Sequence, residues 1–152
     1  MMAKLHSKKK GRSGSQKSRY SRVPEWNEFK AEEVEELVVK SSKDGSQPST
    51  IGLILRDTHG VGNVRILTGK TIVQILKENN ASTEIPETLM NLIRQAVRIR
   101  KHLGANKSDR ASKVKLLHAE SKIHRLVKYY KQRKILPASW FYTQERGALL
   151  VK

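Results

Sequence analysis

The sequence predicts an all-α protein, a helical bundle with a long antiparallel helical hairpin and a basic disordered N-terminal arm. Three observations predict this class. Two long segments, 86–103 and 109–131, place apolar residues at the spacing of an amphipathic helix. A short polar turn joins them, as in an αα-hairpin. Residues 1–22 carry eight Lys or Arg, no acidic residue and no helical or strand period.

The arm, residues 1–22, consists almost entirely of Lys, Arg, Ser and Gly. It has too little apolar surface to offset the conformational entropy that ordering would cost. We expect it to become ordered on a phosphate-rich surface, with Lys8, Lys9, Lys10 and Arg12 as its densest cationic cluster. A plain solubilising or targeting tail would explain the same composition.

A helical extension is expected over residues 23–80, and it begins with an acidic helix from Asn27 to Ser42. The glutamates of this helix lie towards its N-terminal half, where the helix dipole favours anions, and the lysines lie at its C-terminal end. No histidine accompanies these glutamates. A solvated helix face therefore explains them better than a metal site.

Two short helices complete the extension. The first runs from Ser46 to Arg56, with Pro48 in its first turn. A glycine-containing connection, 57–67, follows, in which residues 64–66 could be extended. Thr68 is expected to cap the second short helix. The adjacent Gly-Lys-Thr triplet is no P-loop, because that motif requires a glycine where Val64 stands.

The C-terminal domain, residues 81–152, holds the hairpin. Pro86 begins its first helix, residues 104–108 form the turn, and the second helix starts near Asp109. One side of the second helix is apolar, with Leu116, Ala119, Ile123, Leu126, Val127 and Tyr130. The opposite side, named here the cationic face, carries Arg110, Lys113, Lys122, Arg125, Lys128 and Lys131. Pro137 ends the helical region, and residues 140–142, Trp-Phe-Tyr, either cover its end or stack on bases.

Composition narrows the possible functions. The 152 residues include 31 Lys or Arg against 14 Asp or Glu, a formal net charge of +17. Repulsion among these positive charges favours binding to a polyanion. Nucleic acid is the commonest partner of this kind, and an anionic membrane surface is the second. We see no signal peptide and no apolar run long enough to span a bilayer. The chain has no cysteine, so zinc fingers, disulfide scaffolds and thiol catalysis are excluded.

Catalytic and cofactor motifs are absent from the sequence. The five histidines have no metal-ligand spacing, and neither HExxH nor GxSxG occurs. We therefore expect no enzyme activity, no cofactor, no metal and no small-molecule substrate.

Ordered motifs along most of the chain resemble the archaeal and eukaryotic form of the small-subunit ribosomal protein S-fifteen family. They are KLHSKKKGRSGS, VPEW, IGLILRDTHGVGNV, LTGKTIVQILKENN, HLGANKSDRASKVKLLHAESKIHRLVKYY and the final ILPASW. The acidic helix favours the archaeal branch. The bacterial form corresponds only to about residues 84–140.

The resemblance implies a helical rRNA-binding protein in the cytoplasm, within the small ribosomal subunit. The expected partners are small-subunit rRNA at a three-way junction of the central domain, neighbouring ribosomal proteins and large-subunit rRNA at an intersubunit bridge. A role in subunit assembly is also implied. Residues 81–152 would form the rRNA-binding domain.

The family turn carries a His-x-x-Asp-x-x-Ser pattern against the RNA minor groove. Asp109 and Ser112 match it here, whereas Asn106 takes the place of the histidine. His102 and Tyr129 match further family positions. The bacterial Thr-Gly-Ser segment is replaced by Ser-Thr-Glu at 82–84, so its glycine contacts are not expected.

The residues support this site independently, since short polar side chains at a turn suit the shallow minor groove of A-form RNA. Capping of the helix would by itself explain Asp109. The expected RNA-binding residues are His102, Asn106, Lys107, Ser108, Asp109, Ser112, Lys113, Lys122, Arg125, Lys128, Tyr129 and the arm cluster Lys8, Lys9, Lys10 and Arg12.

Three other interpretations compete with this one. The cationic face could be merely solvated. Residues 49–76 could form a DNA-binding helix-turn-helix, but their segment is nearly neutral. A membrane-surface role is disfavoured because the apolar side of the long helix is needed for the core.

Overall fold

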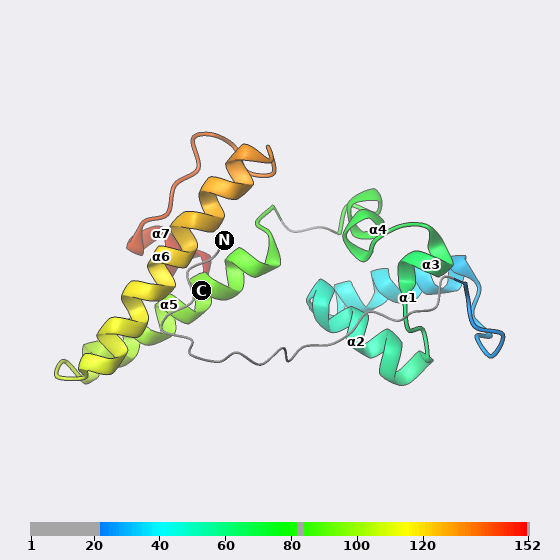
Figure 1. The fold of residues 1–152 in the computed structure, drawn as a ribbon, viewed down its shortest axis with the longest axis horizontal. Helices are drawn as coiled ribbons and strands as arrows, with labels where there is room; N and C mark the ends of the chain where they lie inside the picture. Colours follow the sequence, from blue (N-terminus) through cyan, green and yellow to red (C-terminus); the bar gives the residue numbers. More distant parts are fainter. Residues whose placement is uncertain (1–21, 82–83, 152) are drawn as a thin grey trace, which may run out of the picture. The chain divides into compact units, whose positions relative to one another are not determined.

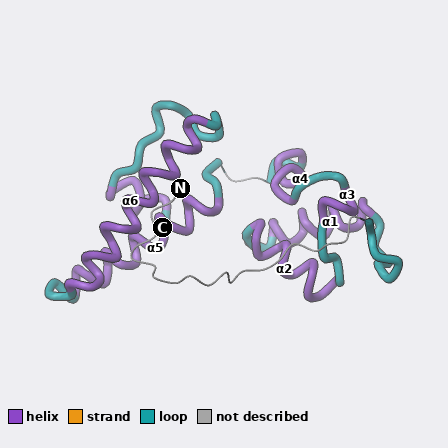
Figure 2. Tube along the Cα trace, viewed as in Figure 1, coloured by secondary structure: helices purple, strands orange, loops and turns teal. Residues whose placement is uncertain are grey.

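The computed structural model describes residues 22–81 and 84–151, and within them every regular element is a helix (Figures 1 and 2). This confirms the predicted all-α class. The chain divides into two compact units at residues 84 and 85, and each unit has its own hydrophobic core. The arm predicted for residues 1–22 lies outside the described residues, apart from Arg22.

The acidic helix, α1, spans Ala31–Lys43 and thus starts four residues later than predicted. A turn holds the preceding segment, because Asn27 N–H donates to the Pro24 carbonyl at 3.0 Å. Lys30 is extended, and its N–H donates to the Glu33 carboxylate at 3.0 Å. Glu33 satisfies a backbone donor from inside the first turn, which fixes the start of the helix.

Helix α2, Pro48–His59, keeps Pro48 in its first turn as predicted but runs three residues further. It ends at Gly60, whose φ of +67° is left-handed. Glycine adopts this conformation without steric cost, so the helix ends at Gly60 and not at the predicted Arg56.

Two predictions in the next segment are wrong. Residues 64–66 are not extended but lie in α3, Val64–Thr68, because the Asn63 side chain accepts a hydrogen bond from the Arg65 N–H and caps the helix. Thr68 is not an N-cap, since its hydroxyl donates to the Val64 carbonyl within α3. The cap of α4, Ile72–Glu78, is Thr71, which forms a capping box with Gln74.

The first unit is held by a core to which α1, α2 and α4 each contribute. Its buried side chains include Val34 and Val38 of α1, Ile51 and Leu55 of α2, and Ile75 and Leu76 of α4. Burial of a Val, Leu or Ile side chain stabilises a fold by about 1.5–3 kcal/mol. The core therefore compensates for the weak intrinsic stability of such short helices.

Helices α5, Glu87–Ala105, and α6, Arg110–Gln132, form the antiparallel hairpin of the second unit (Figure 1). Helix α5 continues through Gly104, so the turn lies later than predicted and comprises residues 106–109. The seam is closed by buried Leu89, Ile93, Ala96, Ala119, Ile123 and Val127. An ion pair between Arg100 and Glu120 adds a polar link across the seam.

A last helix, α7 (Gln144–Leu150), was not expected from the sequence and packs on α5. Gly147 permits this contact, because a Cβ there would lie 3.0 Å from Tyr142 Cε2 and 3.4 Å from Ile93 Cγ2. The predicted lid is correct for Trp140 and Tyr142, which pack on the core. It is wrong for Phe141, whose exposed ring lies 4.8 Å beneath the Arg146 guanidinium.

Candidate nucleic-acid interface

The turn between α5 and α6 is built by backbone hydrogen bonds at both helix ends. Asn106 N–H donates to the His102 carbonyl at 2.9 Å and ends α5. Asp109 N–H donates to the Asn106 carbonyl at 3.2 Å, which turns the chain towards α6. Asp109 is then the N-cap of α6, and its Oδ1 accepts the Ser112 N–H at 2.9 Å. The predicted cap is therefore confirmed.

Four of the predicted RNA-binding side chains meet at this turn. His102 Nε2 lies 3.0 Å from Asp109 Oδ2, which connects the end of α5 to the start of α6. The Asn106 amide nitrogen lies 3.3 Å from His102 Nδ1. Because the Ser112 backbone N–H donates to the other carboxylate oxygen, a continuous chain of hydrogen bonds runs from the Asn106 side chain to the Ser112 backbone.

Asp109 is the electrostatic centre of this arrangement. Its pKa is held well below the usual range of a carboxyl group, first by the Ser112 hydroxyl and backbone N–H and then by the His102 ring. Asp109 is therefore a carboxylate at neutral pH. An oriented anion beside RNA would be repelled by phosphates, so any favourable RNA contact must come from donors such as 2′-hydroxyls or base N–H groups.

Cationic and small polar side chains surround the network. Lys107 and Ser108 in the turn and Lys113 in the first turn of α6 are exposed. Their side chains take no part in the hydrogen bonds that join His102, Asn106, Asp109 and Ser112. The two lysines therefore add positive charge beside the Asp109 carboxylate and leave their ammonium groups open to solvent.

The cationic face of α6 is less uniform than the sequence pattern suggested. Arg125 and Lys128 are exposed, while Lys122 is half-buried at its edge. Val114 and Leu117 also lie on this face and are 48% and 65% exposed. The face is therefore divided, with an apolar patch near the turn and a cationic cluster in the second half of the helix.

Tyr129 lies in that second half, and its ring is 47% exposed. The Arg133 guanidinium lies 5.6 Å from its ring centroid, and the Tyr130 ring packs edge-on against it. An exposed aromatic ring beside guanidinium and ammonium groups can stack on a base while the cations contact phosphates. Arg133 was not among the predicted residues, although its spacing of four from Tyr129 is a recognisable helical pair.

The structure thus separates the predicted residues into two sets. The first set is gathered at the turn, and the second, Lys122, Arg125, Lys128 and Tyr129, lies about 20 Å further along α6. On a helical wheel Arg125 is about 140° from Ser112, so the two sets face different directions. Lys8, Lys9, Lys10 and Arg12 lie outside the described residues.

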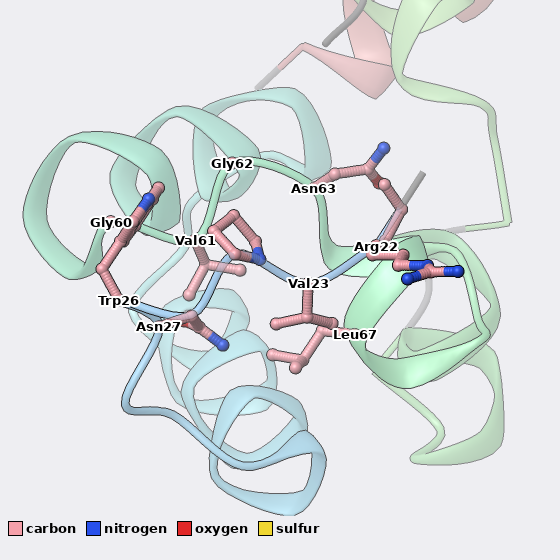
Figure 3. Close-up of a pocket in the computed structure, with 11 residues that line it drawn as sticks. Arg22, Val23, Trp26, Asn27, Gly60, Val61, Gly62, Asn63 and Leu67 are labelled. Atoms are coloured by element: carbon pink, nitrogen blue, oxygen red, sulfur yellow. The ribbon is translucent and has the colours of Figure 1, made fainter. Parts of the chain in front are cut away.

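Figure 3 shows a cavity of about 160 Å³ in the first unit. Its walls are mainly apolar, with Arg22 as the charged lining residue. Trp26 stands at its edge, 66% exposed, with its ring against Gly60. The cavity gathers no cluster of titratable or nucleophilic side chains, so it suggests no chemistry of its own.

Metal-ligating clusters and membrane-spanning helices are both absent from the described ranges. No group of His, Cys, Asp or Glu able to hold a metal ion occurs in residues 22–81 and 84–151. Within those ranges no helix is long and apolar enough to cross a membrane.

Tyr142 packs on the core of the second unit, where its hydroxyl is buried and has no hydrogen-bond partner among the described residues.

Known proteins resemble the chain along almost its whole length. Residues 2–61 match the family described as the Ribosomal S13/S15 N-terminal domain, and residues 71–150 match Ribosomal protein S15. The chain is 49% identical to the small ribosomal subunit protein uS15 of Methanococcus vannielii over 151 residues, which cover 99% of this chain and 100% of that protein. Proteins of the same name from Brugia pahangi and Wuchereria bancrofti are each 47% identical over 150 residues, or 99% of both chains.

These matches include both halves of the chain, the extension as well as the hairpin unit. They confirm the resemblance that the ordered motifs indicated, in its archaeal and eukaryotic form. The chain belongs to the ribosomal protein S15 family of the small ribosomal subunit.

Proposed function

We propose that this protein is a structural constituent of the small ribosomal subunit, in the cytoplasm, and that it binds small-subunit rRNA through the α5–α6 hairpin. The observation that carries the proposal is the hydrogen-bonded turn, in which His102, Asp109 and Ser112 are held in one network. Family membership supports the ribosomal role, and the net charge of +17 supports a polyanionic partner.

The turn would contact the minor groove through hydrogen-bond acceptors. Both Asp109 oxygens are oriented by neighbouring donors, and the carboxylate keeps one further lone pair beside the Ser112 N–H, the Ser112 hydroxyl and the His102 ring. The Ser112 hydroxyl donates to Asp109 and leaves its own lone pairs available. Such acceptors complement the donors displayed in the groove, which are the 2′-hydroxyls and the amino group of guanine.

The cationic cluster would hold a second RNA segment by its phosphates. Arg125 and Lys128 are exposed and face away from the turn network, so a single straight RNA groove would not contact both surfaces at once. A branched RNA would contact both, because its arms leave a junction in different directions. This geometry supports the three-way junction of the central domain, with a neighbouring stem, as the site bound during subunit assembly.

The apolar patch formed by Val114 and Leu117 lies between the two RNA-binding surfaces along α6. Aliphatic side chains there can contact ribose or a neighbouring ribosomal protein, both of which fit a ribosomal position. The proposed contact with large-subunit rRNA at an intersubunit bridge rests on the family resemblance alone.

The DNA-binding alternative is weaker on structural grounds. Its proposed region includes Lys70, but this ammonium group is engaged by Glu78 at 2.7 Å and by Glu35 at 3.5 Å. A lysine held in this way is a poorer phosphate ligand than the exposed Arg125 or Lys128. No observation specifically favours a catalytic function.

Binding to three nucleic acids at matched salt tests the proposal. The probes are the central-domain three-way junction of small-subunit rRNA, an RNA duplex of equal length and a DNA duplex of equal length. We expect the junction to bind most tightly and to lose its advantage in the Asp109→Asn variant. Equal affinity for all three probes would refute specific rRNA recognition and leave only a general polyanion binder.

A further inference from the structure

Asn106 stands where the family pattern has a histidine, and its amide is directed at a neighbour inside the turn. The amide nitrogen, Nδ2, lies 3.3 Å from the backbone carbonyl oxygen of His102. The same nitrogen lies 3.3 Å from Nδ1 of the His102 ring. One amide group therefore contacts both the main chain and the side chain of the residue four positions earlier.

These two contacts determine which nitrogen of the neutral His102 ring carries the proton. A backbone carbonyl can only accept a hydrogen bond, so the amide atom beside it must be the nitrogen. Since that nitrogen is a donor, the ring Nδ1 that faces it must accept, and it carries no proton. The proton of a neutral His102 is then on Nε2, where Asp109 Oδ2 accepts it at 3.0 Å.

We propose that Asn106 is a positioning residue for RNA recognition, which fixes His102 as the neutral Nε2–H tautomer and thereby orients the Asp109 carboxylate. This inference rests on the proposed function of the turn and adds how the turn is kept in its binding form. Asn106 would not replace the family histidine as an RNA donor, because its amide N–H groups are directed at His102.

The tautomer matters because it decides which ring nitrogen donates to the carboxylate. The opposite tautomer would carry its proton on Nδ1 and leave Nε2 as an acceptor facing Asp109 Oδ2, 3.0 Å away. A donor at Nδ1 would face the donor at Asn106 Nδ2, and the hydrogen bond between them would break. Asn106 thus disfavours the Nδ1–H tautomer and keeps the hydrogen bonds in a single direction, from Asn106 towards Asp109.

The first test observes the ring directly in the free full-length protein. NMR of the histidine ring nitrogens at about pH 8, where an unperturbed histidine is neutral, distinguishes the two tautomers and the imidazolium. The His102→Gln variant identifies the His102 signals among those of the five histidines. We expect a single Nε2–H tautomer in the native protein and a mixture of tautomers in Asn106→Ala.

The isosteric variant Asn106→Asp gives a sharper expectation, because it replaces the donor beside Nδ1 with an acceptor. The Nδ1–H tautomer of His102 should then be populated at the same pH, because the new carboxylate accepts a hydrogen bond from it. A native ring protonated at Nδ1, or a ring unchanged in both variants, would overturn the inference. Circular dichroism verifies that the variants remain folded.

The second test measures affinity for the central-domain junction RNA in a double-mutant cycle. Asn106→Ala should weaken binding about fivefold in the native background, the loss typical of one hydrogen bond. It should have no effect in the His102→Gln background, because the residue through which it acts is absent. An undiminished fivefold loss in that background would show that Asn106 contacts the RNA itself, and would overturn its positioning role.

A failure of the proposed RNA-binding function would be distinguished from a failure of the Asn106 proposal by a different measurement. If Asp109→Asn bound the junction RNA normally, the turn would not be a recognition surface, whatever the ring tautomer. The NMR result is measured without RNA and does not depend on that outcome.

Discussion

Replacing Lys122, Arg125 and Lys128 together with glutamine tests whether the cationic cluster of α6 binds RNA or is only solvated. The three residues span about 9 Å along the helix, and two of them, Arg125 and Lys128, are exposed. Removing one cation from a phosphate should cost about 1 kcal/mol, the strength of a charge-assisted hydrogen bond reduced by solvent screening. The triple variant should therefore bind more weakly by about 3 kcal/mol, or roughly 100-fold.

The assay is a titration of fluorescent junction RNA over a series of salt concentrations. The slope of log K against log salt should become shallower by about 2 to 3, because each released phosphate removes about 0.7–0.9. Non-specific duplex RNA should be affected similarly, since phosphate contacts carry no sequence information.

A matched control removes the same charge elsewhere. Lys40, Lys43 and Lys77 of the first unit are exposed, and their replacement with glutamine lowers the net charge equally. We expect only a small loss of affinity from this control. Equal losses in both triple variants would mean that total charge alone drives binding, and a cluster variant with native affinity would mean that the face is merely solvated.

Further predictions concern the arm, the turn and α7. Deletion of residues 1–20 should leave the melting temperature nearly unchanged but weaken RNA binding and its salt dependence; unfolding on deletion would contradict this. Ser112→Ala should leave the helical content, measured by circular dichroism, unchanged and lower affinity for junction RNA about fivefold, whereas native affinity would remove Ser112 from the interface. Gly147→Ala should lower stability by about 1 kcal/mol, because the cost of overpacking against Tyr142 exceeds the gain in helix propensity; a rise in Tm would disprove the tight contact. Because the folded-state pKa of Asp109 is depressed, its stabilisation is present above the unfolded-state pKa of about 4 and is lost as pH falls below it. The difference in Tm between the native protein and Asp109→Asn should therefore shrink below about pH 4, and a difference independent of pH would contradict the assigned charge.

The sequence was most informative where local and tertiary signals coincide. In the hairpin, the apolar spacing of both helices, Pro86 before α5 and the Asp109 cap before α6 all indicate the same boundaries. Long amphipathic helices carry enough periodic positions for their buried sides to be recognised. The fold of the second unit was therefore largely predictable.

The boundaries of the short helices were less predictable, because each boundary depends on a single capping contact. Thr68 and Thr71 are both plausible N-caps in the sequence, and only the reciprocal contact with Gln74 selects Thr71. Helix α7 has seven residues and little periodicity, and its place depends on Gly147 fitting against Tyr142. Such close packing is a tertiary property that residue spacing does not reveal.

The candidate interface was predictable in its residues but not in its connections. The pattern of polar residues identified Asp109 and Ser112, yet the contact between Asn106 and His102 depends on where α5 ends. The cationic face was predicted to be continuous, whereas exposed Val114 and Leu117 interrupt it. Helical spacing assigns residues to a face, but it does not tell which of them remain in contact with solvent.

Directed cleavage of rRNA from the turn tests the central proposal most directly. The chain has no cysteine, so Ser108→Cys creates a single attachment point for an iron chelate in the exposed turn. Thr50→Cys in α2 serves as the control. After assembly into small subunits, we predict that hydroxyl radicals from position 108 cleave the central-domain three-way junction and that those from position 50 cleave elsewhere. Subunits that contain the protein but show no cleavage of the junction from position 108 would contradict the proposal.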